Sequence, residues 1–166
     1  GLGELAIYES CEPTAALDRL QALAECCKGH AVPMLVHANE PVGHKYPGKS
    51  PLGPDFFYEL ARRAAGVPLI LAHWGGGLGF YELLRKEVRE VLANVYYDTA
   101  ASPFLYRPQI FPLMMQVLGG GKILFGSDFP LLAPRRYFEE LSQCGLEAAD
   151  IAAILGHKTL SMVKRY

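Results

Sequence analysis

The stretch MLVHANEPVGH, residues 34–44, places three apolar side chains directly before a histidine. A short apolar run of this kind is typical of a buried β-strand, and His37 stands at its end. An acid, Glu40, and a second histidine, His44, follow in a segment that also contains proline and glycine. His37 is therefore either a polar residue that happens to end a strand or a ligand that is held there.

Two further apolar runs end in the same way. VPLILAH, at residues 67–73, ends on His73, and KILFGSD, at residues 122–128, ends on Asp128. Together with the run before His37, they belong to a set of expected strands near residues 4–9, 33–37, 68–73, 94–98 and 122–126. Strands that are almost wholly apolar are covered on both faces, which predicts a parallel sheet with helical crossovers.

Helical patterns separate these runs. Apolar residues recur at helical spacing in segments 15–30, 55–65, 78–92 and 106–121, and further helical segments follow residue 128. Pro112 is expected to break the helix over 106–121, and glycines are expected to end it. Residues 41–54 are rich in proline and glycine and are expected to form a loop.

Composition narrows the class of protein. A length of 166 residues favours one domain, and 51% hydrophobic residues suffice for a core. A net charge of −1 favours neither nucleic-acid nor membrane-surface binding, and no apolar run is long enough to span a membrane. The start, GLGELAIYES, does not resemble a signal peptide, and the four cysteines form no C-x-x-C motif. A cytoplasmic protein with reduced thiols is expected.

The three polar strand ends suggest a metal site. In a parallel α/β sheet the carboxyl ends of the strands share one edge, where active sites form. His37, His73 and Asp128 offer imidazole and carboxylate groups, which suit zinc, manganese or iron. Taken singly, each histidine could be structural and Asp128 could be a helix N-cap. Three such residues at equivalent strand ends favour metal binding.

The segments VHANEPVGH, LILAHWGGGLGFYELL, NVYYDTAASPFLY and ILFGSDFPL resemble the second half of an amidohydrolase-related metal-dependent hydrolase. This TIM-barrel group includes decarboxylases of the aminocarboxymuconate-semialdehyde type. The resemblance covers residues 1–155 and implies an α/β fold, a partial (β/α)8 TIM barrel of about five parallel strands with crossover helices. Residues 156–166 are expected to form a helical tail.

The resemblance also implies roles for individual residues. His37 matches a metal ligand after the fifth barrel strand. His73 matches a residue after the sixth strand that is either a second ligand or the group that activates the catalytic water. Asp128 matches an aspartate after the eighth strand, which is a metal ligand and a proton shuttle. His73 and Asp128 are thus the expected catalytic residues, and a divalent metal, with zinc favoured over manganese or iron, is the expected cofactor.

Neighbouring residues are candidates for substrate contacts. Glu40, His44 and Trp74 are expected to contact a small-molecule substrate, although Glu40 could be a loop cap and His44 a solvated residue. The glycines at 75–77 would let the backbone approach the site closely. Tyr97, Asp98 and Ser102 are expected to line the next strand end, where Asp98 could also serve only as a turn former.

One feature of the family is missing. The family begins with a strand that ends in a His-x-His pair of metal ligands, and this sequence contains no His-x-His. Only five of the eight barrel strands are recognised. The chain is therefore expected to be the C-terminal portion of a barrel, with exposed strand edges that favour a homo-oligomer or a complementing chain. Whether it binds metal without the pair stays open.

The last residues resemble a different family. LGHKTLSMVKRY is similar to the final catalytic box of tyrosine recombinases, in which a histidine precedes the nucleophilic tyrosine, as His157 precedes Tyr166. The other residues that a recombinase needs are absent in a matching arrangement, and the net charge of −1 disfavours DNA binding. An amphipathic helix with Leu160 and Val163 packed inward is expected instead.

Three functions remain in competition. The first is a metal-dependent hydrolase, in which metal-activated water attacks a carbonyl-type carbon, His73 assists and Asp128 shuttles the proton. The second is a decarboxylase of the same family. The third is an inactive structural fragment that binds no metal. Stoichiometric metal separates the third function from the first two.

Overall fold

The computed structural model describes residues 1–8 and 12–156, which form two compact units. The first unit is Gly1–Tyr97, and the second begins at Asp98. The boundary falls at the last residue of a strand, so one strand supplies the end of one unit and the start of the next. The expected helical tail, with Leu160 and Val163, lies outside the described residues apart from Gly156.

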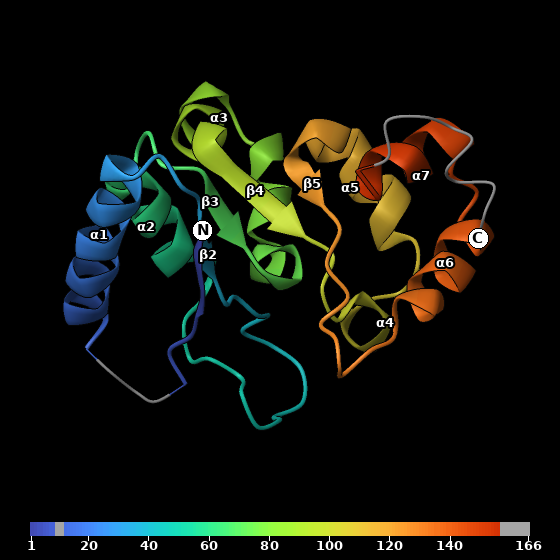
Figure 1. Ribbon diagram of the computed structural model, residues 1–166, viewed down its shortest axis with the longest axis horizontal. Coiled ribbons are helices and arrows are strands. Elements are labelled where there is room, and N and C mark those ends of the chain that lie inside the picture. Colours follow the sequence, from blue (N-terminus) through green and yellow to red (C-terminus); the bar gives the residue numbers. More distant parts are fainter. Residues whose placement is uncertain (9–11, 157–166) are drawn as a thin grey trace. The chain divides into compact units, whose positions relative to one another are not determined.

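The five strands lie side by side in the sheet in the same order as they follow along the chain (Figure 1). They are β1 (Leu2–Leu5), β2 (Met34–Val36), β3 (Leu69–Leu71), β4 (Val95–Asp98) and β5 (Ile123–Leu124). Helices lie between successive strands, as the crossover connections of parallel strands require. The α/β class with five parallel strands and crossover helices is confirmed, and it is the arrangement of part of a TIM barrel.

The sheet of the first unit is parallel, with a regular register from β2 to β4 and a register shift between Leu2 and Leu5 in β1. Met34 pairs with both Leu2 and Leu69, and Leu69 pairs with Val95. Met34, Leu69 and Val95 are fully buried at 0% exposure, which places the core beneath the middle of the sheet. Apolar side chains on both faces of β2 and β3 explain why these strands read as continuous apolar runs.

Two helices cover this sheet. Helix α1 (Pro13–Gly29) begins with Pro13 in its first turn, and the Glu12 side chain accepts a hydrogen bond from the Ala15 N–H at 2.9 Å. Helix α2 (Pro54–Arg63) also begins with proline. The two helices bury one apolar stripe each, made of Ala16, Leu17, Leu20, Ala24 and Cys27 in α1 and of Phe56, Phe57, Leu60 and Ala61 in α2.

The helix expected over residues 78–92 is mostly not α-helical. The structure has instead a 3-10 segment, η1 (His73–Leu83), then the short helices α3 (Lys86–Val91) and η2 (Leu92–Asn94). Residues 74–77 have positive φ inside η1, so an α-helix cannot start there. The glycine run changes the local backbone in a way that apolar periodicity does not reveal.

The second unit contains four α-helices among its described residues. They are α4 (Ser102–Leu105), α5 (Ile110–Leu118), α6 (Pro134–Gln143) and α7 (Ala148–Ile154), with a short turn, η3 (Gly120–Lys122), before β5. The expected break at Pro112 is wrong, because Pro112 is the third residue of α5. Its missing N–H lies in the first turn, where no intrahelical acceptor exists. The expected glycine stop is confirmed by Gly119, with φ 74°.

The first strand is shifted from its expected position. The sequence predicts a strand near 4–9, whereas β1 ends at Leu5. At this end β1 still pairs with the chain just beyond β2, which ends at Val36. The His37 N–H donates to the Leu5 carbonyl at 2.8 Å. Among the residues that the structure describes, no helix has the length and apolar character that crossing a membrane requires.

Candidate metal centre

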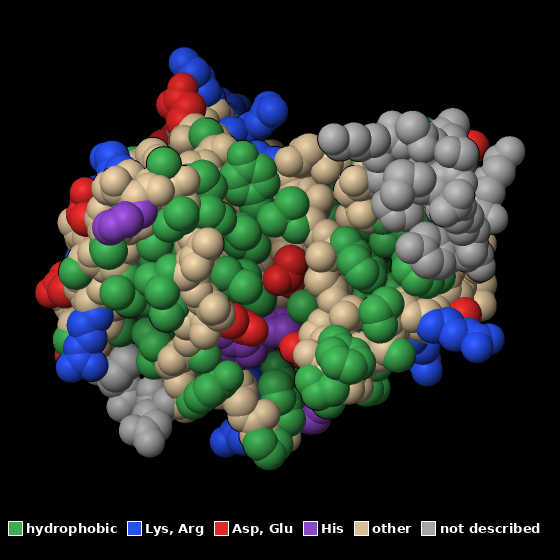
Figure 2. Space-filling view, in the orientation of Figure 1, with side chains coloured by type: hydrophobic (Ala, Val, Ile, Leu, Met, Phe, Trp, Pro, Cys, Tyr) green, Lys and Arg blue, Asp and Glu red, His purple; other side chains and the backbone are tan. Residues whose placement is uncertain are grey.

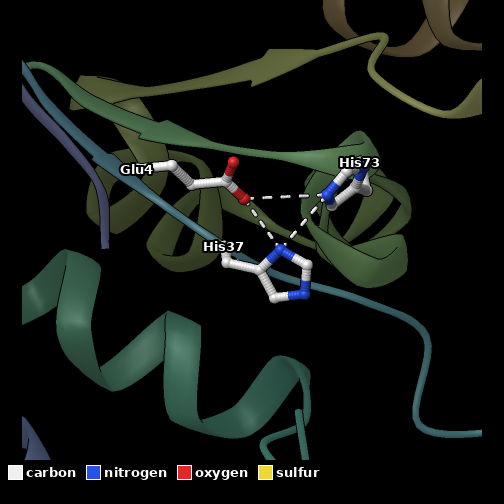
Figure 3. A group of neighbouring side chains, drawn as sticks. All are labelled: Glu4, His37 and His73. Carbon is white, nitrogen blue, oxygen red and sulfur yellow. Dashed lines mark hydrogen bonds and ion pairs between the residues drawn. The ribbon is translucent and has the colours of Figure 1, made fainter. Parts of the chain in front are cut away.

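Three side chains of the first unit converge on one point (Figure 3). The Glu4 Oε1 atom lies 2.7 Å from His37 Nδ1 and 3.7 Å from His73 Nε2. The two imidazole nitrogens are 3.2 Å apart. All three groups are of types that bind divalent metals, so the donor set fits such an ion.

The parallel ladder explains why these residues meet. His37 directly follows β2, and His73 follows β3 with one residue between them. The Ala72 N–H donates to the Val36 carbonyl at 3.0 Å, which sets the two strand ends side by side. Glu4 lies in β1 on the other side of β2, and its longer side chain reaches the same point. The expected convergence of strand ends therefore occurs for His37 and His73.

A left-handed turn sets the direction of the His73 side chain. His73 and Trp74 have φ of 55° and 58°, and the next three residues, Gly75–Gly77, also have positive φ. For a residue with a β-carbon this conformation costs roughly 1–2 kcal/mol. Strain of this kind persists only where the surrounding structure enforces it, and it is common at functional sites.

Close packing against the turn holds the backbone in this strained conformation. A β-carbon at position 75 would lie 2.9 Å from the ring of Tyr97, and one at position 76 would overlap the backbone of Asn39. The Tyr97 hydroxyl donates to Glu82 Oε1 at 3.3 Å, and both side chains are buried. Burial raises the pKa of Tyr97, and the Glu82 carboxylate raises it further, so the hydroxyl keeps its proton.

The electrostatics of the cluster favour an ionised Glu4. Its hydrogen bond with His37, followed by that with His73, lowers the pKa of Glu4 to about 2. The side chains of His37 and His73 are only 10% and 7% exposed, whereas that of Glu4 is 35% exposed. The space-filling view shows histidine and acidic side chains next to one another at the surface (Figure 2), so a small ion or molecule can approach such groups.

The loop after β2 carries two of the expected substrate contacts. Asn39 closes its base, because the Asn39 side chain accepts a hydrogen bond from the Ser50 N–H at 2.6 Å and donates to the Ser50 carbonyl at 3.2 Å. Within the loop, Lys49 donates to the carbonyls of Val42 and His44 at 2.5 and 3.2 Å. The loop is therefore held by its own hydrogen bonds rather than by regular secondary structure.

The expected substrate residues lie in different environments. The Glu40 Oε1 atom is buried and makes no hydrogen bond to the described residues, whereas His44 is exposed. Trp74 is fully buried at 0% exposure. Tyr8, which was not predicted, lies with its ring centroid 5.6 Å from that of His37 and is 57% exposed. Substrate contact by Glu40, His44 or Trp74 stays a prediction.

Asp128 belongs to the second unit. It follows β5 in the left-handed region with φ 63°, and Asp98, at the end of β4, accepts a hydrogen bond from the Ala100 N–H at 2.9 Å. The turn-forming role of Asp98 is thus observed. Burial raises the pKa of the nearby Tyr137 hydroxyl, which donates to the Ser127 carbonyl at 3.1 Å. The metal-binding and proton-transfer roles of Asp128 stay predictions.

Glu4 is the residue that the sequence analysis missed. It lies inside a strand rather than at a strand end, so the pattern that identified His37 and His73 does not include it. The available signal is a single carboxylate within the mostly apolar segment 2–7, LGELAI. Such a residue is costly in a strand that is covered on both faces unless a partner satisfies it.

Parallel strands with crossover helices define an α/β fold that matches part of a TIM barrel, and the ligand-type side chains beyond the ends of β2 and β3 form a candidate metal centre. Within this class, the chain belongs to the amidohydrolase family, whose model matches residues 5–157. A comparison with curated proteins found no match.

Solved structures share the fold at low identity. A dihydroxybenzoic acid decarboxylase from Polaromonas sp. JS666, with bound manganese and 2-nitroresorcinol, has a TM-score of 0.59 and 16% identity over 88% of this chain and 54% of its own. The 5-carboxyvanillate decarboxylase from Sphingomonas paucimobilis has a TM-score of 0.61 and 12% identity over 86% of this chain and 52% of its own. An uncharacterised TIM-barrel protein from Bordetella bronchiseptica has a TM-score of 0.62 and 16% identity over 89% of this chain and 50% of its own. This chain thus spans about half the length of these proteins.

Proposed function

We propose that this chain carries the metal-binding part of an amidohydrolase-family enzyme that removes CO2 from a small carboxylic acid. The observation that carries the proposal is the convergence of His37 and His73, with a carboxylate, at the strand ends of a chain from this family. Decarboxylation is favoured over hydrolysis because two of the solved structures with the same fold are named decarboxylases.

His37 and His73 would hold the divalent ion through ring nitrogens that already face one another at 3.2 Å. Such an ion, when bound, supplies a positive charge that polarises a substrate oxygen or lowers the pKa of water. The nine-tenths burial of both rings limits their movement, so the position of a substrate oxygen near them is well defined.

Asp128 is assigned the proton transfer. When the bond to the carboxylate carbon breaks, CO2 leaves and the remaining carbon keeps the electron pair. A proton delivered from the Asp128 carboxyl group completes the product, and the resulting carboxylate regains its proton from solvent. This assignment rests on the family resemblance of the segment ILFGSDFPL.

Glu40 is assigned a substrate contact. Its Oε1 atom is buried and has no hydrogen-bond partner among the described residues. A buried carboxylate oxygen without a partner is costly, and a hydroxyl or N–H group of a substrate would satisfy it. A hydroxylated aromatic acid, as named for the two decarboxylases, offers such a donor.

Hydrolysis is the second candidate, and the match to the amidohydrolase family favours it. In that reaction a water molecule attacks a carbonyl carbon, and Asp128 takes the water proton and passes it to the leaving group. Zinc is the ion favoured from the sequence, and manganese is the ion bound in the dihydroxybenzoic acid decarboxylase. The substrate and the ion are both parts of this proposal.

The test compares the two reactions on one preparation. The full chain, loaded separately with zinc, manganese or iron, is incubated with hydroxybenzoic acids and with simple amides and lactones. Released CO2 and hydrolysis products are then measured. Decarboxylation is expected with the wild type and with His30→Ala, a control histidine at the exposed end of α1, and it is expected to disappear in His37→Ala. Hydrolysis alone would support the second candidate.

A chain that binds metal but turns over neither substrate class would contradict both enzymatic proposals. A chain that binds no metal at all would favour the inactive structural fragment. Because this chain spans about half the length of the solved structures, the same assay is repeated on any longer form of the protein. Activity restricted to the longer form would place the missing function in the additional residues.

A further inference from the structure

We infer that Tyr8 recognises the ring of the substrate, so that planar aromatic acids bind beside the two histidines in preference to saturated acids of the same size. This inference deepens the proposed function and rests on it, because it names the side chain that selects among small carboxylic acids. Tyr8 lies outside the pattern of apolar runs ending on polar residues that points to His37 and His73.

Tyr8 lies at the same end of the sheet as the two histidines. It follows the last residue of β1, Leu5, by three positions, and His37 and His73 lie just beyond the ends of β2 and β3. The centroid of the Tyr8 ring is 5.6 Å from that of His37, with 64° between the ring planes. The His37 ring is in turn 4.8 Å from that of His73. Three rings therefore follow one another beyond the ends of three neighbouring strands.

The three rings differ in how much of their surface a ligand can reach. The side chains of His37 and His73 are only 10% and 7% exposed, whereas Tyr8 is 57% exposed. The steep contact with His37 holds part of the Tyr8 ring and leaves the larger part open to solvent. A small molecule bound against the imidazoles therefore lies within reach of the exposed part of the Tyr8 ring.

The loop after β2 approaches the Tyr8 ring without covering it. A β-carbon at Gly48, which has φ 91°, would lie 3.7 Å from Tyr8 Cε1, a distance of ordinary van der Waals contact. Because glycine has no side chain, the ring edge that faces Gly48 stays free. The Tyr8 hydroxyl also makes no hydrogen bond to a residue that the structure describes. The described part of the fold thus leaves both the ring and the hydroxyl available to a ligand.

An aromatic side chain distinguishes an aromatic ligand from a saturated one. The negative face of one aromatic ring attracts the positive edge of another, in offset-stacked or edge-to-face geometry. A saturated ring lacks this charge pattern although it is at least as apolar, so hydrophobic burial alone would not favour the aromatic acid. The ring of Tyr8, rather than its hydroxyl, is therefore the group that discriminates, and Tyr8→Phe should keep the preference.

The experiment uses benzoate and cyclohexanecarboxylate as probes, because each carries one carboxylate on a six-membered ring and both are ionised at neutral pH. Their dissociation constants for the full chain are measured by calorimetry, with zinc or manganese present and again without metal. Wild type and Tyr8→Phe are expected to bind benzoate at least about fivefold more tightly than cyclohexanecarboxylate. Tyr8→Leu is expected to bring the two dissociation constants within about twofold of each other.

Tyr81→Leu is the matched control and should keep the wild-type ratio. Tyr81 is 49% exposed in the same unit, and it makes no ring contact with the described histidines. A further measurement needs no variant to fold: nuclear Overhauser effects are expected between the protons of bound benzoate and those of the Tyr8 ring in the wild type. Absence of these effects, equal or undetectable binding of the two acids by the wild type, or an unchanged ratio in a folded Tyr8→Leu chain would overturn the inference.

The proposed function is judged separately on the same preparations, by their metal content and by CO2 release. A chain that prefers benzoate through Tyr8 but releases no CO2 from hydroxybenzoic acids would support ring recognition and contradict decarboxylation. A chain that releases CO2 but binds the two probe acids equally would support decarboxylation and overturn the role of Tyr8.

Discussion

Gly76 lies against the main chain of Asn39 so closely that a β-carbon at position 76 would overlap the Asn39 carbonyl oxygen. This contact joins the segment after β3 to the segment after β2. Each segment carries one imidazole of the candidate metal centre, His73 and His37. The relative position of the two ligands therefore depends on the absence of a side chain between the two segments.

Gly76→Ala is expected to destabilise the protein by more than about 3 kcal/mol. Strain at φ 58° costs about 1–2 kcal/mol, and displacement of the Asn39 backbone adds to it. Gly77→Ala is the matched control, because Gly77 also has positive φ but a β-carbon there would meet no atom within 4 Å. Urea unfolding should show only the strain for Gly77→Ala, and equal losses in the two variants would contradict the contact.

Asn39→Ala is expected to lower the free energy of unfolding by about 1–3 kcal/mol, because it leaves the buried N–H and carbonyl of Ser50 without their partner. The loop between residues 39 and 50 should also become easier to cleave. Limited proteolysis under native conditions measures that effect. Lys49→Met, which removes a cation bonded to two loop carbonyls, should raise cleavage without the full loss of stability.

Glu59 gives a prediction in pH. Hydrogen bonds from Arg62, and then from Arg63, lower the pKa of Glu59 to about 2 from an ordinary value of 4.5. Because this pKa is lowered in the folded state, the contribution of the Glu59 carboxylate to the free energy of unfolding is complete above pH 4.5. It is lost as the pH falls through about 2. Glu59→Gln should cost less than about 1 kcal/mol at neutral pH, because these side chains are partly exposed. The difference from wild type should shrink in acid, and a constant difference down to pH 2 would contradict the pairing.

Thr99→Val tests the second unit. The Thr99 hydroxyl donates to the Gly126 carbonyl at 2.9 Å and accepts from the Gly126 N–H at 3.1 Å, next to the ends of β4 and β5. Valine keeps the shape and removes both bonds, so a loss of about 1–3 kcal/mol is expected. Thr99→Ser keeps the hydroxyl and should recover most of that loss. Thermal unfolding of the three proteins measures the comparison.

The sequence predicts the fold well where hydrophobic runs are short and bounded. The α/β class, the strand order along the chain and the positions of His37 and His73 follow from apolar runs that end on polar residues. Helix and strand bounds are less well predicted, because hydrogen bonding to a neighbouring strand decides where β1 stops. Pro112 illustrates the same limit, because a proline disrupts the interior of a helix but is tolerated in the first turn, where Pro112 lies in α5.

The candidate metal centre is predicted only in part. The approach of His37 and His73 follows from strand ends in a parallel sheet, whereas Glu4 reaches them from inside a strand through the length of its side chain. The lone carboxylate in a mostly apolar segment is the one local signal, and it does not reveal the partners, which lie 33 and 69 positions away along the chain. The left-handed turn at Gly75–Gly77 is equally difficult to predict, although the glycine run signals a close backbone approach.

The closed base of the loop between Asn39 and Ser50 has a consequence for how specificity can change. The two residues fix where the loop leaves and rejoins the fold, and His37 lies outside that closure. The residues between them can therefore be exchanged or lengthened at little entropic cost while the imidazole stays in place. The loop and the cluster of Glu4, His37 and His73 are thus held by separate contacts, so the loop can be redesigned while the geometry of the cluster is left unchanged.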